Sequence, residues 1–129
     1  MISQEERLTA TEVCRMQQEM GLMPTGRREL ASASCRIAMA EGLPEHMQAG
    51  TREVLDVIAS NPRKGHATSL MHKVCKEADR AGITLILTCK QFQDGMTDEQ
   101  LIKWYGRFGF ISIQDEPVIM ARQVQIERH

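Results

Sequence analysis

The chain has 129 residues, enough for one domain with a single hydrophobic core but not for two. Sixteen Lys and Arg residues nearly balance seventeen Asp and Glu residues, which argues against a basic surface for nucleic acid or for a membrane. No apolar run approaches the length of a membrane-spanning helix. The polar, acidic N-terminus differs from a signal peptide. The cysteines lack metal-ligand spacing, so we expect free thiols, no metal site and a cytoplasmic protein: Cys14, Cys35, Cys75 and Cys89.

Residues 1–52 are predicted to be mainly helical. Residues 3–20 carry a rough apolar stripe of Leu8, Val13, Met16 and Met20, which predicts a helix that stops at Gly21. Residues 27–41 fit two patterns. Leu30, Ala33, Ile37 and Ala40 fit a helix, whereas Ala33, Cys35, Ile37 and Met39 fit a strand equally well. The alanine content favours the helix, with Gly42 as its end and a polar loop over 42–50.

The stretch 53–81 is the most informative region of the chain. A strand over 53–59 places Glu53, Leu55, Val57 and Ala59 on one face, and Val54, Asp56 and Ile58 on the other. A basic turn follows, and then a helical pattern at Leu70, Val74, Ala78 and Ala81. Backbone N–H groups at a helix start favour a phosphate, and Gly65 would let one approach closely. From this stretch alone, an ordinary solvated turn explains the pattern equally well.

The remainder completes an α/β arrangement. Residues 83–88 form a β-branched, apolar run, and a right-handed crossover would set this strand parallel to the first. A capping box at Thr97 and Gln100 predicts a helix that continues to Gly109. Residues 110–113 and 118–121 then read as a hairpin.

These segments together resemble the GNAT superfamily of N-acetyltransferases, in particular its small, compact members of phage or mobile-element type. Gly65 and Ala67 match the last two defined positions of its pyrophosphate motif, Arg/Gln-x-x-Gly-x-Gly/Ala, although Pro62 stands at the first and the arginine is displaced to Arg63. Tyr105, Gly109 and Phe110 resemble its C-terminal helix signature, and 120–122 its closing Met-x-Arg. The resemblance implies one domain over 1–129. It would have a helical N-terminal region at 1–52, a mixed sheet with a β-α-β cofactor core within 53–122, and a C-terminal helix plus hairpin. Members normally have strands before the motif strand, and 1–52 shows no convincing strand run.

The resemblance also implies residue roles toward acetyl-CoA. The turn would hold the pyrophosphate, and the backbone of the motif strand would face the pantetheine, with 88–90 on the opposite lip. Tyr105 would be the acid that protonates the thiolate, the alternative being a half-buried tyrosine bonded to a backbone carbonyl. Glu53 would be the base, the alternative being a solvated carboxylate, and Asp56 is the second candidate on the other face. The implied cofactor-binding residues are Val57, Ile58, Ala59, Arg63, Lys64, Gly65, His66, Ala67 and Thr68.

The implied function is transfer of an acetyl group from acetyl-CoA to a primary amine on a small molecule or a protein. The alternative is a catalytically inactive CoA-binding protein that acts as a binding or inhibitory protein, which the short N-terminal half favours. An open edge of the motif sheet would need a cover, so we also expect weak self-association into a homodimer.

Overall fold

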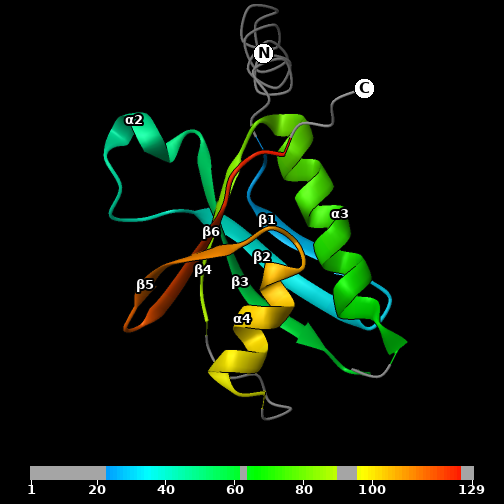
Figure 1. Ribbon diagram of the computed structural model, residues 1–129. Helices are drawn as coiled ribbons and strands as arrows, with labels where there is room; N and C mark the ends of the chain where they lie inside the picture. Colours follow the sequence, from blue (N-terminus) through cyan, green and yellow to red (C-terminus); the bar gives the residue numbers. More distant parts are fainter. Residues whose placement is uncertain (1–22, 62–63, 90–95, 126–129) are drawn as a thin grey trace, which may run out of the picture.

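The computed structural model describes residues 23–61, 64–89 and 96–125, and within them one six-stranded mixed sheet in the order β1-β2-β3-β4-β6-β5 (Figure 1). The predicted helix over 3–20, Cys14, Arg63 and Lys90 lie outside these ranges. The elements are β1 (Gly26–Leu30), β2 (Ala33–Met39), α2 (Glu45–Gln48), β3 (Thr51–Ala59), α3 (His66–Ala81), β4 (Thr84–Thr88), α4 (Asp98–Gly106), β5 (Ile111–Asp115) and β6 (Val118–Arg122).

The predicted β-α-β unit is confirmed. β3 and β4 are parallel neighbours, and α3 connects them. The apolar stripe predicted for α3 is its buried face, which includes Leu70, Val74 and Ala78. The helix ends at Gly82, whose φ of 69° lets the chain turn back so that the Ile83 N–H donates to Ala78 O at 2.8 Å.

The helix predicted over 27–41 is wrong, and residues 1–52 are therefore not helical throughout. β1 and β2 form an antiparallel hairpin in this stretch, with Leu30 opposite Ala33 across the turn Ala31–Ser32. Ala33, Cys35 and Ile37 are buried, so the alternation with period two describes this segment. Because pairing with β3 covers β2, tertiary contacts outweigh the helix propensity of alanine. The loop predicted over 42–50 contains the single turn α2.

One face of the sheet carries the hydrophobic core. α3 packs on β1, β2 and β3, while α4 contributes Leu101 and Tyr105 to the same cluster of buried side chains. His72 of α3 meets Phe108, which follows α4, edge to face at 4.9 Å. Both long helices therefore cover the same side of the sheet (Figure 1).

The opposite face is only half covered within the described ranges of the chain. Its apolar side chains are half-buried or exposed and lie outside the core cluster: Leu55, Ile58, Ile86, Ile111 and Ile119. Ile111, on the edge strand β5, is 64% exposed. One side of the sheet is thus a packed core, whereas the other offers half-apolar surface next to the central strand β3.

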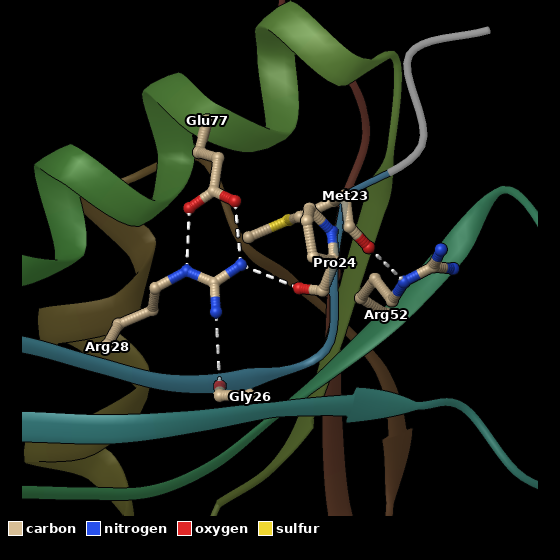
Figure 2. A network of polar contacts seen from close by, with 6 residues as sticks. All are labelled: Met23, Pro24, Gly26, Arg28, Arg52 and Glu77. Atoms are coloured by element: carbon tan, nitrogen blue, oxygen red, sulfur yellow. Dashed lines mark hydrogen bonds and ion pairs between the residues drawn. The ribbon is translucent and has the colours of Figure 1, made fainter. Parts of the chain in front are cut away.

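Polar contacts fasten the ends of the elements to one another. Arg28 of β1 makes a bidentate ion pair with Glu77 of α3, and its Nη2 also donates to Pro24 O (Figure 2). Arg52, 5% exposed, donates from Nε to Met23 O at 2.8 Å and from Nη1 to carbonyls around α2. These contacts tie the segment that precedes β1 to α3 and to β3.

The C-terminal region follows the prediction closely. Thr97 and Gln100 form the capping box, with Gln100 N–H donating to Thr97 Oγ1 at 3.2 Å and Thr97 N–H donating to Gln100 Oε1 at 2.9 Å. α4 ends at Gly106, three residues before the predicted end at Gly109. β5 and β6 form the predicted hairpin. Among the described helices, none is long and apolar enough to cross a membrane.

Candidate active site

The central parallel strands separate after a short stretch of pairing. β3 pairs with β4 only from Thr51 to Glu53, opposite Thr84 to Ile86. Beyond Glu53, β3 pairs with β2 alone, and beyond Ile86, β4 pairs with β6 alone. Among the described residues, the edge of β3 that faces β4 therefore has no ladder over Val57, Ile58 and Ala59. We call this opening the splay; its backbone groups can bond an extended ligand, as an open sheet edge does.

A β-bulge in β3 lies at the splay. The register with β2 shifts between Ser34 and Arg36, and Asp56 has a left-handed backbone with φ 52°. The predicted alternation puts Val57 on the same face as Leu55. Because of the bulge, Val57 instead lies in the core together with Val54. The bulge also turns the Asp56 carboxylate to Arg36, which donates from Nε at 2.8 Å.

Arg36 pairs with Leu55 across the strands, so this ion pair brings Asp56 to the face that carries Leu55 and Glu53. The sequence pattern placed Asp56 on the face opposite Glu53, and that placement is wrong. A non-glycine residue with positive φ costs roughly 1–3 kcal/mol, and such residues cluster at functional sites.

The turn between β3 and α3 begins the helix without a side-chain cap among the described residues. Gly65 is the N-cap, with φ 71°, and the Ser69 N–H donates to Gly65 O at 3.1 Å as the helix begins. The N–H groups of His66, Ala67 and Thr68 come before this first helical bond, so they have no acceptor within the helix. Apart from its chain neighbours, no described residue places a heavy atom within 4 Å of a Cβ built on Gly65, and Lys64 beside it is exposed. Open space, backbone donors and positive charge meet at this point.

Tyr105 is buried in the core beneath the sheet, 4% exposed. Its ring meets Trp104 and Phe110 edge to face, at 4.9 and 5.7 Å. Burial first, and then the charges of Cys89 and Cys35, raise the pKa of the Tyr105 phenol far above its ordinary value. The hydroxyl keeps its proton at any physiological pH and can donate it in a hydrogen bond.

Glu53 is half-buried on the other face, at the point where the splay begins. Ala38 and Ile86 are its register partners on the adjoining strands. The structure does not bring Tyr105 and Glu53 together on one face. It places them on opposite sides of the sheet, with the splay between them.

The described cysteines, Cys35, Cys75 and Cys89, are free and buried, as expected. Burial raises the pKa of Cys35 and of Cys75 to about 11 and that of Cys89 in the same direction, so these thiols are poor nucleophiles. A half-open cavity of about 360 Å³ lies elsewhere, between the second half of α3 and the turn after α4. Its floor is the ion pair of Asp79 with Arg122, which joins α3 to β6.

Comparison with protein-family models and with curated proteins finds no match. Solved structures do match. The anti-CRISPR protein AcrVA5 superposes with a TM-score of 0.61 at 19% identity, over 77% of this chain and 98% of that protein. An aminoglycoside 6′-acetyltransferase of type Ii gives 0.52 at 20% identity, over 75% and 64%. A Desulfovibrio desulfuricans protein assigned as an acetyltransferase of the GNAT family gives 0.53 at 13% identity, over 73% and 62%.

The chain has the fold of the GNAT N-acetyltransferases. At these identities the likeness establishes the fold alone. The chain spans less than two thirds of the length of the two acetyltransferases, but nearly the whole of AcrVA5. The expected mixed α/β sheet with a β-α-β core is confirmed, and the GNAT-like strands before β3 are present as β1 and β2.

Two features of the site were missed at the sequence level. The bulge at Asp56 has no glycine or proline to announce it. The contacts of Ser32 with the turn before α3 depend on the β1–β2 hairpin, which was predicted as helix. The alternation of Ala33, Cys35 and Ile37 was the signal that could have revealed this hairpin.

Proposed function

We propose that this chain is an acetyl-CoA-dependent N-acetyltransferase that acetylates a primary amine. The observation that carries the proposal is the splay between β3 and β4, which leads to the uncapped start of α3. An extended ligand with an anionic end fits this combination, because unpaired strand edge and helix N–H groups follow one another along the chain. When bound, acetyl-CoA would supply an activated thioester.

The residues at the turn would hold the pyrophosphate. Gly65, His66, Ala67 and Thr68 form the start of α3, where helix N–H groups favour an anion, and Lys64 adds positive charge next to them. The family resemblance assigns Arg63 to the same role. The backbone of Val57, Ile58 and Ala59 would bond the pantetheine amides across the splay.

Tyr105 and Glu53 would act from opposite faces of the sheet. On the half-covered face, Glu53 would accept the proton of an amine that approaches the start of the splay. On the core face, Tyr105 would donate a hydrogen bond to the departing sulfur. Because burial raises its pKa, full proton transfer to a thiolate with an ordinary pKa of about 8.5 is uphill, so the hydrogen bond is its main contribution.

A binding protein that retains the cofactor site without catalysis is the second candidate. One observation favours it, because the raised pKa makes Tyr105 a weak acid. Such a protein would act by occupying a macromolecular partner.

Release of free thiol from acetyl-CoA in the presence of primary amines tests the proposal. The panel would contain polyamines, aminoglycosides, lysine-containing peptides and amino acids, with the mass of the acetylated acceptor as confirmation. Amine-dependent thiol release supports the transferase. Tight binding of acetyl-CoA without release from any acceptor favours the binding protein, and absence of binding contradicts both.

A further inference from the structure

Ser32, in the turn between β1 and β2, contacts both ends of the loop that precedes α3. On one side, the Ser60 N–H and the Ser60 hydroxyl both donate to Ser32 O, at 3.0 and 3.2 Å. On the other side, the Ser32 N–H lies 3.2 Å from His66 Nδ1, and the Ser32 Oγ lies 2.6 Å from the same nitrogen. Ser60 follows β3, and His66 is the first residue of α3. One residue of the β1–β2 hairpin therefore holds the chain both at Ser60 and at His66.

These contacts define the state of the His66 ring. A backbone N–H can only donate, so Nδ1 of His66 must accept, and the proton of the neutral ring resides on Nε2. The Ser32 hydroxyl then donates to the same lone pair. His66 thus presents an acceptor to the hairpin and a donor, Nε2–H, on its other side.

We propose that His66 is a positioning residue which, clamped by Ser32, sets the conformation of the pyrophosphate-binding turn. This inference rests on the proposed function. The loop between the two pinned ends contains Gly65, whose left-handed backbone aims the N–H groups of the first helical turn. Because loop ordering is costly, fixing both ends before the ligand arrives lowers the entropy lost on binding.

We call the contact of Ser32 with His66 the clamp. Loss of the clamp should weaken only a ligand that carries the pyrophosphate. S-acetylpantetheine lacks the pyrophosphate and the nucleotide, whereas acetyl-CoA contains both. In the full-length chain, we expect His66→Ala to weaken acetyl-CoA about tenfold, as expected for the loss of preorganising hydrogen bonds, and to leave S-acetylpantetheine affinity unchanged. Calorimetry measures the affinity for acetyl-CoA, and an NMR titration measures the affinity for S-acetylpantetheine.

Three variants sharpen the test. His66→Asn keeps an acceptor, Oδ1, at the position of Nδ1 and should bind acetyl-CoA within about twofold of the original chain. Ser32→Ala removes only the hydroxyl and should give an intermediate loss. His72→Ala, at an exposed position of the same helix, is the matched control and should bind as the original chain does.

The outcomes separate this inference from the proposed function. If the original chain binds neither ligand, the proposed function falls, and the clamp with it. If the original chain binds acetyl-CoA and His66→Ala binds it equally well, only the clamp is refuted. A loss of equal size for both ligands, or a failure of asparagine to restore binding, also refutes it, since either result describes a general role in folding.

Discussion

Gly65 and Gly82 lie at the two ends of α3. Substituting each of them in turn separates the effect of backbone strain from the effect of contact with the ligand. Both have a left-handed backbone, with φ 71° and 69°, and a Cβ built at either meets no heavy atom of the described residues within 4 Å, its chain neighbours aside. An alanine at either position should therefore cost similar strain, about 1–2 kcal/mol. In a domain of this size, that strain lowers the Tm by about 4–7 °C.

Only Gly65 lies at the proposed pyrophosphate site. A methyl group there enters the space that the ligand needs, and the strain shifts the N–H groups that would bond it. We expect Gly65→Ala to weaken acetyl-CoA at least about tenfold, or about 1.4 kcal/mol, while Gly82→Ala binds as the original chain does. Thermal unfolding and calorimetry of both variants provide the measurement. Equal affinities in the two variants would refute the assignment of the turn, and clearly unequal Tm values would refute the strain argument.

Four further predictions concern catalysis, stability and assembly. Tyr105→Phe should lower turnover about 100-fold, as the loss of one hydrogen bond to a developing negative charge does, with little change in acetyl-CoA affinity, and the raised pKa of Tyr105 predicts no alkaline limb from this group below pH 10; full turnover would remove its role. Glu53→Gln should lower turnover at neutral pH and recover at high pH, where the free amine needs no base; a pH-independent defect would argue against this role. Burial alone would raise the pKa of Asp79, but hydrogen bonds from Arg122 and the Gln125 amide, with the Arg122 charge, lower it. Asp79→Asn should therefore cost roughly 2–4 kcal/mol of unfolding free energy, a contribution present above the unfolded pKa near 3.9 and lost as pH falls through the lower folded value. Urea unfolding checks it, and an equal loss at pH 2 and pH 7 would contradict it. Finally, Ile113 is 55% exposed on the edge strand β5. We propose that this strand mediates weak self-association, so light scattering should detect dimers that Ile113→Lys abolishes; a strict monomer at high concentration would exclude this.

The segments whose local signals agree were predictable from the sequence. α3 has an amphipathic stripe and a glycine at its C-terminal end, and α4 has a capping box, so local pattern and final structure coincide. β3 and β4 are apolar runs of strand length separated by α3, and this crossover fixes their parallel relation.

The hairpin of β1 and β2 was not predictable in the same way. Its two-residue turn uses Ala31 at φ 52°, a position where glycine or asparagine usually signals a hairpin. Without that signal, the alanine content favoured a helix. Pairing with β3, a contact distant in sequence, decides the outcome.

The geometry of the site was the least predictable feature. Gly65 and Ala67 lie at the start of α3 and Tyr105 lies in α4, as the sequence order of the motifs predicts, but the splay depends on where pairing between β3 and β4 stops. The bulge at Asp56 likewise follows from the register with β2, and it reverses the face assigned to Asp56. Register is set between strands, so one strand's sequence does not contain it.

A crystal structure of the complex with coenzyme A tests the central claim most directly. We expect the pyrophosphate within hydrogen-bond distance of the N–H groups of Gly65 to Thr68. We also expect the pantetheine along the edge of β3 in the splay, with the sulfur near the Tyr105 hydroxyl. A cofactor bound elsewhere, with the splay empty and the turn without a phosphate, would contradict the proposed site and the function derived from it.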